Sequence, residues 1–175
     1  MDNFFLQQAY AQACKAFDQD EVPVGAILVD GNGKILARAY NQIEQKGTQL
    51  AHAEMQVLAK AAKKMNNWRL QNTTLYVTVQ PCMMCIGALF LSRVERVVFA
   101  VKSLKFGVNT IQSEGIYKNL KLKIEYSPDE QSAELLKLFF KKKRSKVTCF
   151  VNQNYIKSNK IYCKEKKKLN KNCKN

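Results

Sequence analysis

The chain contains a single histidine, His52, which stands two residues before Glu54. Further along, Pro81-Cys82-Met83-Met84-Cys85 places two cysteines three positions apart. Positions i and i+3 of a helix lie on one face, so Cys82 and Cys85 can hold one ion between them. Each pattern alone is ambiguous, because a lone histidine is more often structural, and a Cys-x-x-Cys pair suits redox, metal-binding or structural roles about equally.

The combination is more informative than its parts. A His-x-Glu that opens one helix and a Pro-Cys-x-x-Cys that opens another are the known signature of zinc nucleobase deaminases. Two thiolates and one imidazole leave Zn²⁺ a fourth position, which water can fill. In this chemistry zinc lowers the pKa of its water, Glu54 takes the proton, and the hydroxide attacks the carbon that carries the amino group.

Apolar periodicity and turn residues indicate the elements that position these groups. Helices are expected at 2–18, 50–65, 82–91 and 128–143, and strands at 22–29, 35–40, 74–79, 94–101 and 120–126. The path from 74–79 through the short helix after Pro81 to 94–101 is a strand-helix-strand crossover, which implies parallel pairing. We therefore predict an α/β fold with a mixed five-stranded sheet covered by helices on both faces.

The composition favours a globular protein that stays in the cytoplasm. Of the 175 residues, 46% are apolar, enough to enclose a core. No run approaches the roughly 18 apolar residues that a membrane span needs, and residues 1–13 lack the pattern of a signal peptide. The six cysteines are thus better explained by metal or redox chemistry at Cys82 and Cys85 than by disulfides.

The charge is uneven along the chain. Residues 141–175 hold 13 Lys or Arg against one acid, Glu165, which accounts for +12 of the net +15. We expect a globular domain over 1–146 and a basic, Lys- and Asn-rich extension over 147–175, weakly ordered. Such an extension suits nucleic acid, although on charge alone a merely solvated tail explains it about as well.

From about Phe4 to Arg144 the sequence resembles the bacterial tRNA-specific adenosine deaminases, which convert the wobble-position adenosine to inosine. The resemblance covers most of the globular part. The segments that carry it are Val22-Pro23-Val24-Gly25-Ala26, Asn41, Ala51-His52-Ala53-Glu54, Trp68-Arg69-Leu70, Thr74-Leu75-Tyr76-Val77-Thr78, Pro81 through Ala88, Ser92-Arg93, Val97-Val98-Phe99 and Phe139-Phe140.

The resemblance implies a role for each matching residue. His52, Cys82 and Cys85 would bind one zinc per subunit, Glu54 would be the catalytic proton shuttle, and Asn41 would contact the flipped nucleotide. It also implies a cytidine deaminase-like three-layer α/β/α sandwich, a homodimer, and the anticodon stem-loop of a tRNA as substrate. Without the resemblance, Asn41 would read as an ordinary turn residue at the end of a strand.

Several positions depart from the family pattern. Gln80 precedes Pro81 where the family usually has Glu, Ser103 stands where an Asp is common, and Gln42-Ile43 follow Asn41 in place of Arg-Pro. None of these changes removes a catalytic atom. Ser103 and the loop after Asn41 bear on RNA recognition, including whether Ser103 relaxes the preference for RNA over DNA.

Two other functions compete with this interpretation. A deaminase of a free base or nucleoside, of the guanine, cytosine or cytidine type, would use the same zinc site. A non-catalytic RNA-binding module would use the zinc only for structure, but it would not require a carboxylate at Glu54.

The basic extension provides a first prediction. If its lysines meet phosphates, a chain without residues 147–175 should bind RNA more weakly and with a flatter salt dependence, while its single-turnover rate stays the same. The measurement is a binding titration of an anticodon hairpin at several salt concentrations. Equal affinity and equal salt slope in the two proteins would show that the extension takes no part in binding.

Overall fold

A computed structural model describes residues 1–103, 107 and 122–145. Met1–Lys137 form one compact unit, which contains all the strands of the described residues, and a second unit begins at Leu138. Residues 130–145 are helical. The predicted extension 147–175 lies outside the described residues, so its boundary stays a prediction.

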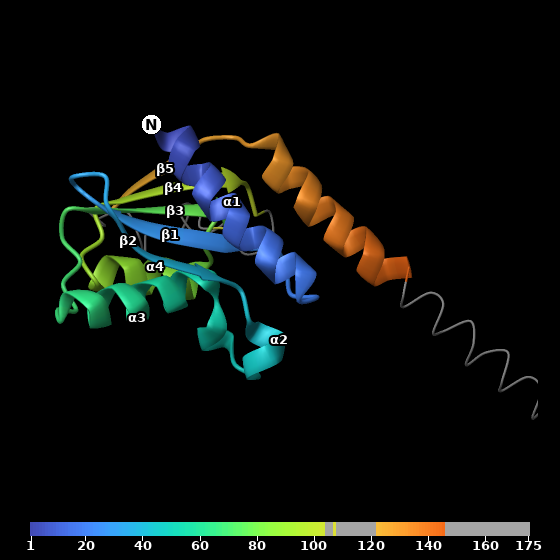
Figure 1. Cartoon of the computed structure of the whole chain (residues 1–175), viewed down its shortest axis with the longest axis horizontal. Coiled ribbons are helices and arrows are strands. Elements are labelled where there is room, and N and C mark those ends of the chain that lie inside the picture. Colours follow the sequence, from blue (N-terminus) through green and yellow to red (C-terminus); the bar gives the residue numbers. More distant parts are fainter. Residues whose placement is uncertain (104–106, 108–121, 146–175) are drawn as a thin grey trace, which may run out of the picture. The chain divides into compact units, whose positions relative to one another are not determined.

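The first unit is built on one sheet with the strand order β2-β1-β3-β4-β5, which Figure 1 shows. β1 lies between β2 and β3 and pairs antiparallel with both. β3, β4 and β5 are parallel. The predicted mixed five-stranded sheet is therefore confirmed, with strands β1 (Gly25–Asp30), β2 (Ile35–Tyr40), β3 (Thr73–Val79), β4 (Arg96–Val101) and β5 (Lys123–Tyr126).

Helices cover both faces of this sheet. α1 (Asp2–Asp18) crosses one face, and α3 (Ala53–Met65) and α4 (Met83–Leu91) lie on the other (Figure 1). Alternate residues of each strand serve the two sides, as a half-turn per residue requires. Ile27 and Val29 pack with α1, whereas Ala26 and Leu28 pack with α3. The unit thus has the predicted α/β/α layers.

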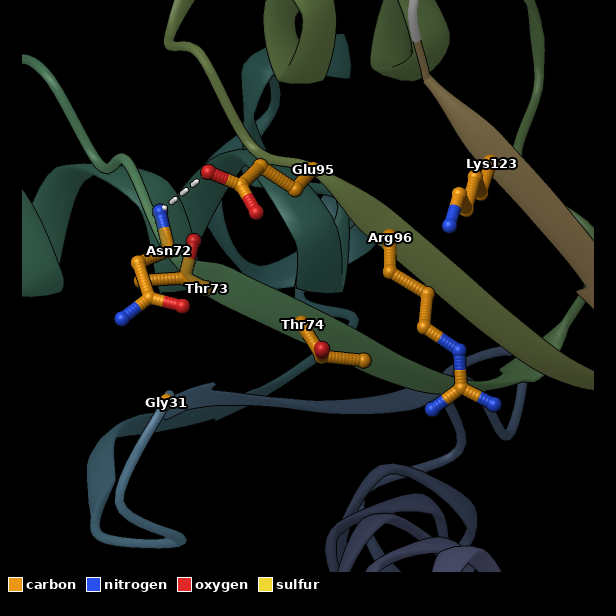
Figure 2. Close-up of a pocket in the computed structure, with 7 residues that line it drawn as sticks. All are labelled: Gly31, Asn72, Thr73, Thr74, Glu95, Arg96 and Lys123. Atoms are coloured by element: carbon orange, nitrogen blue, oxygen red, sulfur yellow. Dashed lines mark hydrogen bonds between the residues drawn. The ribbon is translucent and has the colours of Figure 1, made fainter.

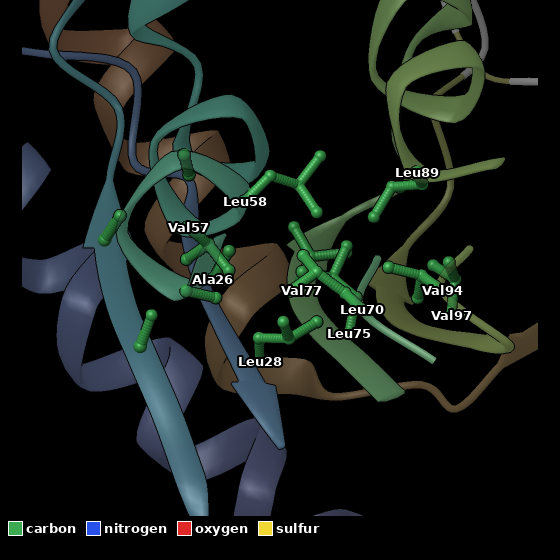
Figure 3. Packing of buried hydrophobic residues seen from close by; sticks show 14 of the residues in the cluster. Ala26, Leu28, Val57, Leu58, Leu70, Leu75, Val77, Leu89, Val94 and Val97 are labelled. Carbon is green, nitrogen blue, oxygen red and sulfur yellow. The ribbon is translucent and has the colours of Figure 1, made fainter. Parts of the chain in front are cut away.

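The larger of the two cores lies between the sheet and α3 and α4, and Figure 3 shows its packing. Its strand residues combine small alanines with larger side chains, namely Ala26, Ala37 and Ala39 beside Leu28, Leu75, Val77, Val97 and Phe99. Complete burial of one such leucine or valine is worth about 1.5–3 kcal/mol. The fully buried members from the sheet and the two helices include Leu28, Val57, Leu75, Val77, Ile86, Leu89 and Val97.

Some predicted boundaries were wrong near the functional residues. The helix expected over 50–65 is two pieces, a 3-10 turn η1 (Gln49–Ala51) and then α3, with His52 as the residue between them. The loop after β2 contains a short helix, α2 (Ile43–Lys46), that the polar sequence did not indicate. The helix expected from Cys82 begins at Met83, because Cys82 is extended (ψ 173°) and forms a β-bridge with Gly107.

Gly25 marks the closest approach of α1 to the sheet. A Cβ atom on Gly25 would lie 2.1 Å from the carbonyl oxygen of Ala9 and 2.3 Å from the backbone nitrogen of Ala13. No side chain fits at such distances. Gly25 therefore allows the helix backbone to rest directly on the start of β1.

α3 also covers the edge of the sheet at β2. Gln56 Nε2 donates to the carbonyl of Tyr40 at 2.7 Å, Lys60 Nζ to Arg38 at 3.1 Å, and Lys64 Nζ to Leu36 at 3.2 Å. The donors recur every four residues on the helix, a rise of about 6 Å, and the acceptors every two on the strand, about 6.6 Å. The matching spacing lets α3 satisfy backbone carbonyls of the edge strand β2, which could otherwise pair with a strand of another molecule.

A polar cluster joins the N-terminus of α1 to the sheet. Both carboxylate oxygens of Asp2 accept from Arg96, at 2.7 and 3.0 Å, and Oδ1 also accepts from the hydroxyl of Tyr76 at 2.7 Å. The hydrogen bonds from Arg96 hold the pKa of Asp2 at about 2.

In the described part of the chain, no helix is long and apolar enough to cross a membrane.

Asp2→Asn should make folding less stable at neutral pH. The folded-state pKa lies below the ordinary value of 3.8, so the carboxylate stabilises the protein above about pH 4 and loses this effect as the pH falls toward 2. Because the Asp2 side chain is 37% exposed, we expect a loss on the order of only 0.5–1 kcal/mol at pH 7. Urea unfolding at pH 7 and pH 2.5 measures it, with exposed Glu134→Gln as control. About a third of the deficit should remain at pH 2.5, because a carboxyl with a pKa of about 2 is still partly ionised there, and a deficit as large as at pH 7 would contradict this explanation.

Candidate active site

The sequence-predicted residues gather where β2 and β3 end. The pairing of Gly25 with Tyr40 and of Ala26 with Val77 brings these two strand ends to the same edge of the sheet. β3 continues into Gln80, Pro81 and Cys82, and α4 starts directly afterwards. The chain after β2 returns at Gln42, whose N–H donates to the carbonyl of Ala51 at 3.0 Å, next to His52.

His52, Cys82 and Cys85 form a compact group whose nitrogen and sulfur atoms all lie within 4.8 Å of one another. The two sulfurs are 3.7 Å apart, and Nδ1 of His52 is 3.5 Å from Cys85 Sγ and 3.9 Å from Cys82 Sγ. Tetrahedral Zn²⁺ with usual bond lengths separates two sulfurs by about 3.8 Å and a sulfur from a nitrogen by about 3.6 Å. The group therefore fits a metal ion of this kind.

The imidazole is oriented for such a role by a residue that the sequence did not single out. Nε2 of His52 lies 3.4 Å from Oε1 of Gln49, on the 3-10 turn that precedes it. An amide oxygen accepts only, so this contact places the ring proton on Nε2 and leaves the Nδ1 lone pair facing the sulfurs. The signal in the sequence was weak, because Gln49 lies in a polar stretch without a pattern.

The two thiols differ in their affinity for protons. The hydrogen bond between the two thiols lowers the pKa of Cys82 to about 4, against the effect of burial and with help from His52. The same contact, together with burial, raises the pKa of Cys85 above its ordinary range. Cys82 therefore loses its proton readily and Cys85 keeps its own. A divalent cation bound between the two sulfurs can replace the proton of Cys85.

Glu54 lies in the first turn of α3 and is only 3% exposed. Burial raises its pKa above the ordinary value, against the lowering influence of its backbone N–H and of His52. Its carboxyl group also interacts with the Cys85 thiol. A buried carboxyl with a raised pKa beside a metal group is suited to taking and returning protons near neutral pH.

Asn41 follows β2 directly and is 4% exposed. Its backbone N–H donates to the carbonyl of Val24 at 2.9 Å, and its side-chain Nδ2 donates to Oε2 of Glu21 at 3.2 Å. The structure places it at the same edge of the sheet as the metal group, but among the described residues no contact joins its side chain to that group. Its side-chain partner is Glu21, which the sequence analysis did not consider.

Gln80 and Ser103, two departures from the family pattern, contact each other. Gln80 is buried, and its Oε1 accepts from the Ser103 N–H at 3.1 Å. A Cβ atom on Gly107 would lie 2.3 Å from that same oxygen, so Gly107 as well as Ser103 lies against the Gln80 amide. Gln80 therefore contacts both residues, while the role of Ser103 in RNA selection stays a prediction.

A separate hollow of about 440 Å³ lies at the other end of β3, lined by Gly31, Asn72, Thr73, Thr74, Glu95, Arg96 and Lys123 (Figure 2). Glu95 accepts from the backbone N–H of Asn72 at 2.9 Å, and Arg96 is paired with Asp2. Glu95 and Arg96 thus already have partners within the protein. The seven-residue strand separates it from the metal group by about 20 Å.

Comparison with known proteins agrees with this geometry. Residues 2–144 match the MafB19-like deaminase family. The tRNA-specific adenosine deaminase of Aquifex aeolicus (strain VF5) is 42% identical over 148 residues, which cover 82% of this chain and 97% of that protein. A solved structure from work on A-to-I editing by tRNA:A34 deaminases superposes with a TM-score of 0.70 at 31% identity, over 77% of this chain and 99% of the other. The guanine deaminase of Bacillus subtilis gives a TM-score of 0.57 at 29% identity, over 65% and 76% of the two chains.

The mixed sheet and the His/Cys/Cys group define a deaminase of the cytidine deaminase-like fold. Within that class, the chain belongs to the MafB19-like deaminase family, whose model matches residues 2–144. It also belongs to the tRNA-specific adenosine deaminases, because it is 42% identical to one of them over almost the full length of that relative.

The metal group gives a direct prediction. The purified protein should contain about one zinc per chain, and Cys82→Ser or Cys85→Ser should remove most of it, because two ligands rarely retain the ion. Cys14→Ser is the matched control, since Cys14 is also a free cysteine but lies on α1 outside the group. Elemental analysis measures the content. Absence of zinc together with a Cys82–Cys85 disulfide would assign the pair to redox chemistry.

Proposed function

We propose that this protein deaminates adenosine to inosine at the wobble position of a tRNA anticodon. The observation that carries the proposal is the compact group of His52, Cys82 and Cys85 with the buried carboxyl of Glu54 beside it. Its presence in a chain 42% identical to a tRNA-specific adenosine deaminase supports the choice of substrate.

Three side chains would hold one Zn²⁺ per chain, namely Nδ1 of His52 and the sulfurs of Cys82 and Cys85. The chemistry of the donor set supports this choice, because two thiolates and an imidazole are typical zinc ligands and a three-ligand site leaves a position for water. When bound, zinc lowers the pKa of that water toward neutrality.

Glu54 carries the protons. It takes one from the attacking water as the oxygen bonds to C6 of adenine, and delivers it to the ring nitrogen N1. It then moves a proton from the new hydroxyl group to the departing amino group, so that one water is consumed and one ammonia is released. Burial favours the neutral carboxyl, so the ionised form takes a proton from water more readily than an exposed glutamate would.

The remaining parts of the proposal concern binding and assembly. Asn41, at the adjoining strand end, would hydrogen-bond the flipped nucleotide. The anticodon stem-loop would be bound by a homodimer in the cytoplasm, where tRNA is modified. The net charge of +15 supports a polyanionic substrate.

A second candidate is deamination of free guanine or of a free nucleoside. The guanine deaminase of Bacillus subtilis shares the fold at 29% identity, so neither fold nor metal group separates the two activities. The distinction lies in the substrate. An RNA enzyme should act on an adenosine in a hairpin and leave free guanine unchanged.

Glu54→Gln tests the mechanism and the substrate together. With an RNA anticodon hairpin, the native protein should form inosine, and the variant should lose about 10²–10⁴-fold in rate, the usual contribution of general acid–base catalysis. Zinc content and thermal stability should change little, because Glu54 does not bind the metal. Inosine is measured by nucleoside mass spectrometry, with guanine offered in parallel. Retained activity in the variant would refute the role of Glu54, and turnover of guanine alone would support the second candidate.

A further inference from the structure

Glu21 is a completely buried carboxylate that the reaction described above does not use. It follows the end of α1, where its N–H donates to the carbonyl of Ala16 at 3.0 Å, and it precedes β1. In the described part of the chain it takes part in no ion pair. A buried carboxylate without a cation must be satisfied by hydrogen-bond donors, so its donors show what it holds.

Each oxygen of Glu21 accepts one hydrogen bond from the segment after β2. Oε2 accepts from Nδ2 of Asn41 at 3.2 Å, and Oε1 accepts from the backbone N–H of Gln45 at 2.8 Å. Gln45 lies in the four-residue helix α2, which has no capping side chain of its own. Glu21 thus attaches both Asn41 and the helix that follows it to the end of α1.

The contact fixes which way the Asn41 amide faces. A carboxylate can only accept, so the nitrogen of the amide must point at Glu21. Oδ1 and the second Nδ2 hydrogen are then left for another partner, and among the described residues none contacts them. Asn41 therefore presents one acceptor and one donor whose directions are set from behind by Glu21.

The backbone of Asn41 is already held on both sides. Its own N–H donates to the carbonyl of Val24 at 2.9 Å, and the N–H of the next residue, Gln42, donates to the carbonyl of Ala51 at 3.0 Å. Only the torsions of its side chain remain free. Fixing them costs rotamer entropy, and the hydrogen bond to Glu21 offsets this cost before any substrate binds. The second of these backbone bonds connects the residue after Asn41 to Ala51, which directly precedes His52.

We propose that Glu21 is a positioning residue, which holds the Asn41 amide so that its oxygen and free N–H meet the nucleotide in a fixed orientation. The inference rests on the proposed function, because that function assigns Asn41 to the nucleotide. Glu21 itself touches no substrate. It acts through Asn41, and this dependence separates the proposal from a purely structural role in holding α2.

Glu21→Gln changes the polarity of the contact at constant shape. The glutamine offers one oxygen where two donors face it, and its NH₂ group confronts either Asn41 or Gln45. The backbone of α2 cannot turn, whereas the Asn41 amide can. Asn41 should therefore rotate and point its NH₂ group at the nucleotide, and kcat/KM for an RNA anticodon hairpin should fall about tenfold, as for one misplaced hydrogen bond.

The decisive experiment is a double-mutant cycle with Asn41→Ala, measured as kcat and KM on the hairpin. If Glu21 works through Asn41, Glu21→Gln should have no further effect on kcat/KM once Asn41 is alanine. Gln56→Leu is the matched control, because Gln56 is also buried and bonds the same segment through the carbonyls of Tyr40 and Ala51 without touching the Asn41 side chain. Its effect should be the same in both backgrounds. If the effects of Glu21→Gln and Asn41→Ala multiply, the proposal is overturned.

A reversal of polarity provides a rescue that a structural role would not produce. Asn41→Asp places two carboxylates face to face and should lower activity further than Asn41→Ala. Adding Glu21→Gln should restore part of it, because the glutamine NH₂ group can donate to the introduced carboxylate and an oxygen again faces the nucleotide. A pair of changes as inactive as Asn41→Asp alone would contradict the proposal.

Failure of the proposed function can be told apart from failure of this inference. If the native protein leaves the hairpin unchanged, the function is wrong, and the cycle is then run with guanine. Independently of activity, the side-chain NH₂ signals of Asn41 in the ¹⁵N-labelled full chain should show one hydrogen protected from exchange with water, and Glu21→Gln should abolish this protection. Equal exchange in both proteins would overturn the inference whatever the substrate.

Discussion

The site depends on the position of β1 between two antiparallel neighbours. β1 pairs with β2 on one side and with β3 on the other, so both neighbours run in the same direction and end at the same edge of the sheet. Asn41 leaves the sheet at one of these ends, and Cys82 follows the other. Every strand residue of β1 except its last, Asp30, is buried. A change in this pairing would move the Asn41 segment away from the cysteines while leaving each element intact.

The end of the sheet that carries the site favours negative charge. His52 is the N-cap of α3 and Cys82 is the N-cap of α4, so two helices begin at the metal group. Helix N-termini carry partial positive charge and unpaired N–H groups, which stabilise thiolates. Glu54 is more deeply buried, and desolvation raises its pKa, whereas the hydrogen bond with Cys85 lowers the pKa of Cys82. Glu54 and Cys82, which both lie at the start of a helix, thus have pKa values shifted in opposite directions.

Much of this arrangement was predictable from the sequence, and the remainder has physical reasons. Periodicity located α1 and the strands, since burial on one face repeats with a fixed step. The residue types and spacing of His52, Cys82 and Cys85 identified the metal group, because few other chemistries need that set. Pattern gave no sign of α2, which is too short to show a period, or of Glu21. The importance of Glu21 arises from contacts with Asn41 and Gln45, about 20 residues away, which the sequence does not reveal.

The central claim is that water, activated at the His52, Cys82 and Cys85 group and deprotonated by Glu54, replaces the amino group of an adenosine in RNA. The most direct test is deamination of an anticodon hairpin in H₂¹⁸O. The masses of the product nucleosides are measured by mass spectrometry, and the altered position is located by sequencing. We predict one ¹⁸O atom in each inosine formed, and inosine at the wobble position alone. Inosine without the heavy oxygen, or no inosine from a protein that contains its full zinc, would contradict this account.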